Sequence, residues 1–308
     1  MKGTRAVVFA YHDVGVRCLK TLLSGGVEVP LVVTVADDPN ETQWYASVAD
    51  TARDYGIEAI TPADANTPQL EHRLAQLKPD FLFSFYYRSM LKAPLLASAR
   101  RGALNMHGSL LPKFRGRAPV NWAILKGERE TGATLHYMVE RADAGDIVDQ
   151  LAVPILEDDD ARAVFAKVTV AAETILARSL PGLIAGSAPR RPQPIEPGQY
   201  FGRRTPEDGR IDWQWPARRI HDLVRAVAPP FPSAFATVGK ERWEIHRTRL
   251  AGAAPGGSSA PRLYGSLGKC LIACADGQLL HLLAAADAHG ALDLESLAPQ
   301  LAQRPVAL

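Results

Sequence analysis

Three polar side chains within one stretch of the sequence are of the types that acyl transfer requires. Asn105 offers an amide, His107 an imidazole and Asp143 a carboxylate. The apolar run 102–106 predicts a buried strand, and side chains two apart on a strand point to the same face. We therefore expect Asn105 and His107 to face one cavity. Asp143 lies in a turn-rich segment that can fold back to orient or charge-stabilise the imidazole.

The elements that must position these residues alternate between strand and helix. Apolar and β-branched runs predict strands over residues 5–11, 31–35, 57–60, 81–85, 102–106, 134–139 and 147–155. Apolar residues at helical spacing predict helices over 15–23, 45–55, 69–77, 91–99 and 161–184. A strand, a helix and a strand in succession imply parallel pairing. We therefore expect an α/β fold with a Rossmann-like doubly wound parallel sheet.

A second, β-rich domain is expected to follow. Residues 1–188 form the predicted catalytic domain, the Pro- and Arg-rich segment 189–200 a linker, and 201–308 the second domain. Its predicted elements are a helix over 217–227, a turn over 229–232, and short strands over 234–238, 243–246, 271–275 and 279–283. Short strands separated by turn signals favour a small open barrel of the OB-like type. The Ala-, Gly-, Pro- and Ser-rich segment 251–260 is predicted to be a mobile loop.

Composition excludes several classes of protein. The net charge is +2, which is not the strongly basic balance of a dedicated nucleic-acid binder. No apolar run approaches the roughly 20 residues that span a bilayer, so we expect a cytoplasmic protein without a membrane span. Cys18, Cys270 and Cys274 are too few and too uneven for a disulfide framework, and a Cys-x-x-x-Cys pair without nearby histidines makes a poor zinc site. Buried thiols and no metal are expected.

A dinucleotide-binding oxidoreductase is the alternative that a Rossmann-like sheet raises. The first strand-to-helix turn, residues 10–15, is Ala-Tyr-His-Asp-Val-Gly and lacks the Gly-x-Gly-x-x-Gly pattern that brings backbone close to a pyrophosphate. NAD binding is therefore not expected. His12 in this turn either lines a ligand cleft or caps the following helix.

Several motifs in order resemble one known family. Asn105-x-His107, the Ser-Leu-Leu-Pro-x-x-Arg-Gly of 109–116 and the Asp-x-Gly of 143–145 are similar to the active-site signature of formyltransferases that use 10-formyltetrahydrofolate. Within that family the chain resembles the ArnA-type branch, which formylates UDP-4-amino-4-deoxy-L-arabinose. The motifs of that narrower resemblance lie at 7–15, 83–88, 115–119 and 201–206. The resemblance runs from about residue 6 to about residue 240.

The resemblance implies roles for the three polar residues. An amine attacks the formyl carbon, a tetrahedral oxyanion develops, and the folate nitrogen leaves with a proton. An imidazole, with an ordinary pKa near ~6.5, suits proton transfer near neutrality, which assigns that role to His107. A donor aimed at the oxyanion is worth on the order of 10² to 10³ in rate, and Asn105 can supply it. Asp143 supports His107. The structural alternative for Asn105 and His107 is a hydrogen-bonded strand end without a catalytic role. For Asp143 the alternative is a residue that only forms a turn.

The resemblance also implies where the two substrates bind. The folate co-substrate would contact Tyr86, Tyr87, Arg88, Met90, Val139 and Asp143. Tyr87 and Met90 are the better ligand candidates, whereas Phe83 and Phe85 are expected to be sheet core. For the acceptor, His12 would line the site and an arginine clamp would hold a diphosphate through bidentate contacts. That clamp consists of Arg115, Arg117, Arg203 and Arg204.

The expected acceptor is a UDP-linked amino sugar, namely UDP-4-amino-4-deoxy-L-arabinose, in lipid A (lipopolysaccharide) biosynthesis and resistance to the antibiotic polymyxin. Three alternatives stay open: methionyl-tRNA, another UDP- or dTDP-linked amino sugar, and a non-catalytic nucleotide-sugar binding module. Transfer-RNA binding needs many phosphate contacts, which the near-neutral balance disfavours. The ArnA-type enzyme that the chain resembles is bifunctional, and its second domain oxidises and decarboxylates UDP-glucuronic acid. This chain ends at Leu308 without room for that domain, so we expect a separate decarboxylase to supply the precursor.

Overall fold

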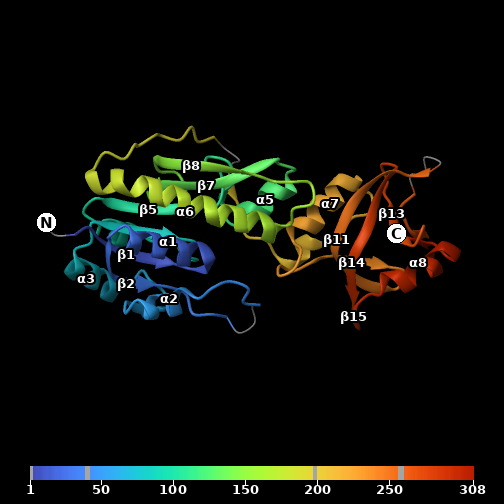
Figure 1. Cartoon of the computed structure of the whole chain (residues 1–308), viewed down its shortest axis with the longest axis horizontal. Coiled ribbons are helices and arrows are strands. Elements are labelled where there is room, and N and C mark those ends of the chain that lie inside the picture. The colour runs from blue at the N-terminus through green and yellow to red at the C-terminus, as the bar shows by residue number, and fades with distance from the viewer. Residues whose placement is uncertain (1–2, 39–41, 197–199, 256–259) are drawn as a thin grey trace. The chain divides into compact units, whose positions relative to one another are not determined.

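The chain forms two compact units (Figure 1). The computed structural model describes residues 3–38, 42–196, 200–255 and 260–308. The first unit comprises Met1–Pro119, Glu130–Val153 and Ala166–Gly202. The second comprises Val120–Arg129, Pro154–Phe165 and Arg203–Leu308. Each unit therefore consists of several separate segments of the chain.

A seven-stranded sheet forms the centre of the first unit. Its strand order is β3-β2-β1-β4-β5-β7-β8. The strands are β1 (Arg5–Ala10), β2 (Glu28–Val33), β3 (Glu58–Ile60), β4 (Phe81–Phe85), β5 (Gly102–His107), β7 (Glu130–Tyr137) and β8 (Ile147–Pro154). The pairs β2–β3, β1–β2, β1–β4 and β4–β5 are parallel, as the Rossmann-like prediction requires. The pair β5–β7 is antiparallel, which the sequence pattern did not predict.

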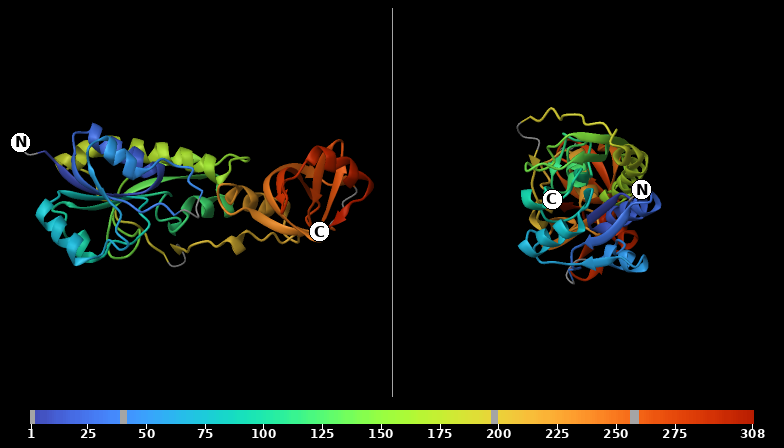
Figure 2. Two further views of the ribbon diagram at one scale, coloured as in Figure 1. Left: turned by 90° about the horizontal axis from the view of Figure 1, so that it is seen from below. Right: turned by 90° about the vertical axis from the view of Figure 1, so that its left-hand side faces the viewer.

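Helices cover both faces of this sheet (Figure 2). They are α1 (His12–Ser24), α2 (Val48–Asp54), α3 (Pro68–Leu77), α4 (Ala93–Leu96) and α6 (Ala161–Ala185). Val7 and Phe9 of β1 pack in one core cluster with residues of α3 and α4. On the other face, α1 lies beside α6, since Arg17 pairs with Glu173. Because the central strands are buried on both faces, β4 is apolar at nearly every position.

Helix α6 meets the length and composition criteria of a membrane-crossing helix, and within the described residues it is the one helix that does. The prediction that no apolar run approaches such a length overlooked this segment. Val164, Val168, Ala171 and Ile175 of α6 are buried. Their spacing of three to four residues places them on one helix face, which packs in the protein core. A long apolar helix that packs in a protein core meets the same length and composition criteria as a membrane-crossing helix.

A short pair of strands joins the loop after β5 to the end of the predicted linker. Strand β6 (Arg115–Gly116) is parallel to β9 (Tyr200–Phe201). The main chain of Arg191 bridges to that of Ile147 through two hydrogen bonds. The segment 189–196 contains no helix or strand. Gln193 of this segment is hydrogen-bonded to the carbonyl oxygens of Asp143 and Gly145. Residues 197–199 lie outside the described part.

The second unit is built on an antiparallel sheet with the order β10-β11-β14-β13-β12-β16. Its strands are β10 (Ala234–Val238), β11 (Glu241–Ala253), β12 (Arg262–Ser266), β13 (Lys269–Ala273), β14 (Gln278–Asp287) and β16 (Val306–Ala307), with β15 (Gly290–Ala291) on β14. Helices α7 (Ala217–Ala226) and α8 (Leu294–Gln303), a 3-10 turn η1 (Pro206–Gly209) and the short α5 (Pro119–Leu125) complete the described elements. The open-barrel prediction is confirmed.

The second unit differs from its prediction in three elements. Strand β11 is 13 residues long where only 243–246 was expected, and it continues into the segment predicted as a loop. Helix α8 was missed; it contains Pro299, a helix-breaking signal. Strand β12 was missed because Gly265 interrupts its apolar pattern. A Cβ at Gly265 would lie 1.8 Å from the Ala298 carbonyl oxygen, so glycine allows α8 to pack directly on the strand.

Candidate active site

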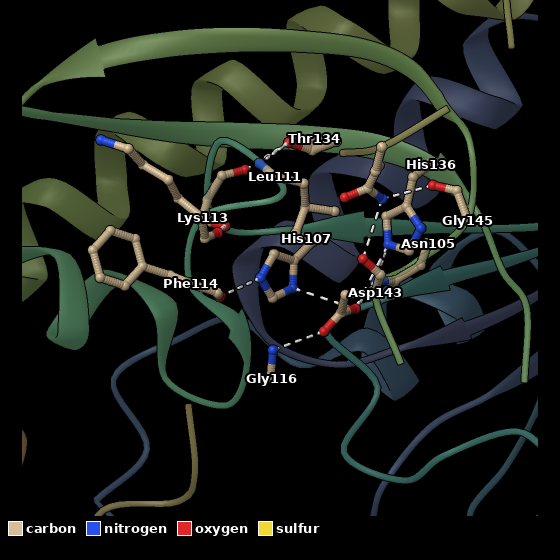
Figure 3. Close-up of polar contacts among 12 residues, drawn as sticks. Asn105, His107, Leu111, Lys113, Phe114, Gly116, Thr134, His136, Asp143 and Gly145 are labelled. Carbon is tan, nitrogen blue, oxygen red and sulfur yellow. Dashed lines mark hydrogen bonds and ion pairs between the residues drawn. The ribbon is translucent and has the colours of Figure 1, made fainter. Parts of the chain in front are cut away.

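The antiparallel pairing of β5 with β7 places four polar residues on one face of the sheet. Asn105 is opposite His136, and His107 is opposite Thr134. Residues two apart on a strand share a face, so all four side chains point the same way at this position. Figure 3 shows Asn105, His107 and His136 directed toward Asp143. The predicted convergence of amide, imidazole and carboxylate is therefore found, and a second imidazole accompanies it.

The loop that carries Asp143 is held folded back by hydrogen bonds at both its ends. The Gly116 N–H donates to Asp143 Oδ2 over 2.9 Å. The Gln193 amide donates to the carbonyl oxygens of Asp143 and Gly145 over 3.1 and 2.6 Å. A Cβ at Gly145 would lie 2.0 Å from the Tyr137 carbonyl oxygen, so a side chain at this position would prevent the fold-back.

Asp143 Oδ1 lies between three nitrogen atoms. It is 3.6 Å from His107 Nδ1, 3.6 Å from His136 Nε2 and 3.4 Å from Asn105 Nδ2. Burial by itself would raise the pKa of Asp143, but positive charge on the neighbouring His107 and His136 rings and the hydrogen bond from the Gly116 N–H outweigh it and lower that pKa. Asp143 is therefore a buried carboxylate that remains ionised at neutral pH.

His136 fixes the orientation of the Asn105 amide. His136 Nδ1 lies 2.8 Å from the Tyr137 carbonyl oxygen, which can only accept, so Nδ1 carries a proton. In the neutral ring Nε2 is then an acceptor, and the Asn105 NH₂ donates to it over 3.1 Å. His136 was not predicted from the sequence. The sequence signal that could have found it is the alternation of two polar residues, Thr134 and His136, along a predicted strand. Both side chains prove to be buried.

His107 is held by the loop that follows it. Its Nε2–H donates to the Phe114 carbonyl oxygen over 2.9 Å, and its other nitrogen faces Asp143. The 3.6 Å separation from Asp143 is longer than a hydrogen bond. Both ring nitrogens thus face oxygen acceptors, and a doubly protonated ring would donate to both.

The loop 109–114 is itself tied to β7 through Thr134. The Thr134 hydroxyl donates to the Ser109 carbonyl oxygen over 2.6 Å and accepts from the Leu111 N–H over 3.1 Å. In Figure 3 the Phe114 ring points away from His107. A cavity of about 230 Å³ is lined by Leu110, Pro112, Lys113, Phe114, Glu130 and Thr131. The three predicted catalytic side chains do not line it.

The residues predicted to contact folate lie in two loops, one after β4 and one after β7. Met90 and Val139 are exposed, at 56% and 45% of their surface. Tyr87 packs edge-on against Phe9, with ring centroids 5.5 Å apart, and so contributes to the core. Tyr86 has a positive φ of 59° at the turn that ends β4. The Arg88 guanidinium lies 4.5 Å from the centre of the Tyr11 ring.

The predicted arginine clamp is not one cluster within a single unit. Arg115 is buried in β6 of the first unit, whereas Arg117 is exposed in the following loop. Arg203 and Arg204 belong to the second unit. There Arg204 donates to the Asp208 carbonyl oxygen over 2.8 Å and lies over the Trp122 ring. Arg115 and Arg117 flank Gly116, whose N–H contacts Asp143, and of these two only Arg115 is buried.

His12 begins α1 and is enclosed by aromatic rings. Its ring centroid is 4.0 Å from that of Tyr45 and 4.5 Å from that of Trp44. His12 Nδ1 accepts a hydrogen bond from the Asp13 N–H over 2.9 Å. Burial and the positive charge of Arg88 lower the pKa of His12 to about 3, so this ring is neutral.

No group of three or more His, Cys, Asp or Glu side chains that could hold a metal ion occurs among the described residues. All three cysteines are buried and free, as predicted. Burial raises the pKa of each of these thiols.

Comparison with known families identifies the class of protein. Residues 5–180 match the formyl transferase family, and residues 203–299 match the formyl transferase C-terminal domain. The chain belongs to the formyltransferase family and is a formyltransferase enzyme.

Solved structures share the fold. An N-formyltransferase from Helicobacter canadensis, solved with folinic acid and dTDP-3-aminofucose, is 22% identical with a TM-score of 0.73 over 91% of this chain and 98% of its own. WlaRD, a sugar 3N-formyltransferase solved with dTDP and 5-N-formyl-THF, is 21% identical with a TM-score of 0.69 over 95% of this chain and 99% of its own. A 4-N formyltransferase from Francisella tularensis is 22% identical with a TM-score of 0.61 over 75% of this chain and 91% of its own.

Proposed function

We propose that this enzyme transfers the formyl group of 10-formyltetrahydrofolate to the 4-amino group of UDP-4-amino-4-deoxy-L-arabinose. The observation that carries the proposal is the meeting of Asn105, His107 and Asp143 on one face of the β5–β7 pair. These groups supply the donor, the proton carrier and the fixed negative charge that acyl transfer to an amine needs.

The transfer exchanges one carbon–nitrogen bond for another. The acceptor amine attacks the formyl carbon, and the carbonyl oxygen becomes negative in the tetrahedral intermediate. The bond from that carbon to N10 of the folate then breaks. Overall the acceptor nitrogen loses one proton and N10 gains one, so a single residue that first accepts and then donates a proton completes the cycle.

His107 is the proposed proton carrier, and Asp143 stabilises its positive charge. Because the pKa of Asp143 is lowered, the carboxylate stays negative when the neighbouring ring gains a proton. The Nε2–H of His107 donates to the Phe114 carbonyl oxygen in this structure. In the proposed reaction the neutral ring carries its proton on Nδ1, which faces Asp143. The unprotonated Nε2 then turns from the Phe114 oxygen to the reacting groups and can accept a proton.

Asn105 is the proposed oxyanion donor. One of its amide hydrogens is directed to His136 over 3.1 Å and the other to Asp143 over 3.4 Å. The longer contact is the weaker hydrogen bond. We propose that the hydrogen directed to Asp143 turns to the oxyanion while His136 keeps the amide in place.

Folate binding is proposed for the loops after β4 and β7. The exposed apolar side chains of Met90 and Val139 are the strongest support, because a flat pterin requires apolar walls. Tyr86, Tyr87 and Arg88 complete the proposed wall through the loop backbone. Two of the similar solved structures carry folate derivatives, folinic acid and 5-N-formyl-THF.

The choice of acceptor rests on charge and on resemblance. A net charge of +2 favours a small nucleotide sugar over a transfer RNA. The similar solved structures include a sugar 3N-formyltransferase and an N-formyltransferase bound to dTDP-3-aminofucose. The ArnA-like motifs favour the UDP-linked 4-amino sugar among these. We propose that the product serves lipid A modification and that a separate decarboxylase makes the precursor.

The test measures formyl loss from 10-formyltetrahydrofolate with a panel of acceptors. The panel contains UDP-4-amino-4-deoxy-L-arabinose, dTDP-linked 3-amino and 4-amino sugars, and charged initiator transfer RNA. We expect the UDP-linked 4-amino sugar to give the highest kcat/KM. Faster transfer to a dTDP sugar would show that this sugar, and not the UDP-linked one, is the preferred acceptor. Transfer only to the RNA would contradict the proposed function.

A further inference from the structure

Arg115 is a buried arginine that forms no ion pair with any residue that the structure describes. The residue is 3% exposed. Its Nε is buried and has no hydrogen-bond partner, and no ion pair of this side chain is found within the described part of the chain. An unpaired charge and an unsatisfied donor are both costly to bury. A group retained under that cost commonly has a partner that arrives from outside.

A second positive charge lies near Arg115. Burial and the charge of Arg141 lower the pKa of Arg115, whereas Asp143 and Tyr200 act in the opposite direction. Arg141 is exposed and lies two residues before Asp143. Asp143 already faces His107, His136 and the Gly116 N–H, so it is not a dedicated counterion for either arginine. The surroundings of Arg115 thus favour an anion.

The backbone of Arg115 is held rigidly. Arg115 and Gly116 pair with Tyr200 and Phe201 in the β6–β9 ladder. A Cβ at Gly116 would lie 2.3 Å from the Phe201 carbonyl oxygen, so the two strands approach closely only because this residue is glycine. A guanidinium on such a fixed backbone loses little entropy when it binds a ligand.

We propose that Arg115 and Arg141 form an anion subsite beside the catalytic carboxylate, and that it binds the diphosphate of the acceptor. The inference rests on the proposed function and deepens it, because it names the two arginines that bind the acceptor. In a UDP-linked 4-amino sugar the diphosphate lies across one sugar ring from the reacting amine. A subsite next to Asp143 therefore suits it. A multiply charged diphosphate matches two guanidinium groups better than a single carboxylate does.

The experiment uses inorganic pyrophosphate as the probe and needs no turnover. Its binding to the full-length enzyme is measured by calorimetry, and its inhibition pattern is measured against each substrate. We expect Arg115→Gln to weaken pyrophosphate binding about tenfold or more, and Arg141→Gln to weaken it by a smaller factor. Arg53→Gln is the control, since Arg53 is an exposed arginine of α2 that pairs with Asp50. Its affinity should stay within about twofold of the wild type.

Two further readouts keep the test decisive. Because Arg115→Gln removes an unpaired buried charge, its Tm without ligand should not fall, and pyrophosphate should raise the Tm of the wild type but not of this variant. Should Arg115→Gln not fold, Arg115→Lys replaces it, and loss of the bidentate fork should still weaken binding.

Three results would overturn the subsite. These are equal losses in Arg115→Gln and Arg53→Gln, pyrophosphate affinity that is unchanged in Arg115→Gln, and pyrophosphate that competes with the folate instead of the acceptor. The last result would place a folate carboxylate at Arg115. A failure of the enzyme to formylate any amino sugar would count against the proposed function, but it would leave the pyrophosphate measurement readable.

Discussion

Two parallel strands of the same sheet, β5 and β1, each lead to a largely buried histidine, and the surroundings of the two rings are opposite. His107 ends β5 and faces the Asp143 carboxylate and the Phe114 carbonyl oxygen. His12 follows β1 and faces the rings of Trp44 and Tyr45, with the positive charge of Arg88 nearby. Asp13 also lies beside His12, with its carboxylate 3.8 Å from Nδ1.

The difference teaches that burial alone does not assign a histidine to catalysis. Burial and Arg88 lower the pKa of His12 to about 3, which keeps that ring neutral. Asp143, by contrast, is held ionised beside His107, which allows positive charge to develop there during a reaction. The partner around each ring decides which histidine can carry a proton.

The largest expected effect comes from His107→Ala. Loss of a general acid–base should lower kcat by about 10³-fold, with binding of both substrates nearly unchanged. Steady-state kinetics and calorimetric affinities separate the two effects. His289→Ala, an exposed histidine in a turn of the second unit, is the control and should keep its kcat. If His12→Asn lowered kcat as much as His107→Ala, the contrast between the two rings would fail.

Asp143→Asn keeps the shape of the carboxylate and removes its charge. We expect kcat to fall by about 10²-fold, because positive charge on His107 loses its partner. The folded-state pKa of Asp143 is depressed, so its contribution to stability is present above the unfolded value near ~4 and is lost as the pH falls below it. Acid denaturation of Asp143→Asn should therefore be less steep than that of the wild type. Curves that coincide would contradict the ionised-carboxylate assignment.

His136 should have a smaller effect, since it acts through the Asn105 amide. His136→Phe removes the acceptor for the amide, and we expect kcat to fall about tenfold while KM for the folate changes little. His136→Gln, whose side-chain oxygen can accept the same hydrogen bond, should recover part of the loss. Equal kcat values for the two variants would show that His136 has only a packing role.

The smallest expected effect on catalysis, and the clearest on stability, comes from His12→Asn. Asparagine tolerates the positive φ of 67° at this position. Because the folded-state pKa of His12 is depressed, its contribution to stability is present above ~6.5 and is lost as the pH falls toward about 3. The wild-type free energy of unfolding should decline by up to about 1.4 kcal/mol per pH unit in that window. Urea denaturation at several pH values should show a shallower decline in His12→Asn.

The local sequence pattern was sufficient to predict many of the strands and helices of the first unit. Strand β4 has the predicted bounds because a strand buried on both faces is a continuous apolar run. Asn105 and His107 were placed on one face by strand geometry alone. His136 was missed because its role depends on which residue of β5 it opposes. Register between β5 and β7 is a property of the sheet and not of either segment.

The arginines show the same limit. Their spacing in the sequence suggested one clamp of four, but only Arg115 is both buried and adjacent to a residue that contacts Asp143. Whether a charge is solvated or buried depends on the strand that pairs with it. Here that strand is β9, which begins in the segment predicted as a linker. No periodic pattern within residues 115–117 carries that information.

The most direct test of the central claim is a double-mutant cycle on single-turnover transfer rates with His107→Ala, Asp143→Ala and the double variant. If the two side chains act as one unit, the double variant should be about as slow as His107→Ala alone, because the carboxylate has no task without the imidazole. Losses that multiply, so that the double variant is slower by the product of the two single effects, would contradict a shared role at one reacting carbon.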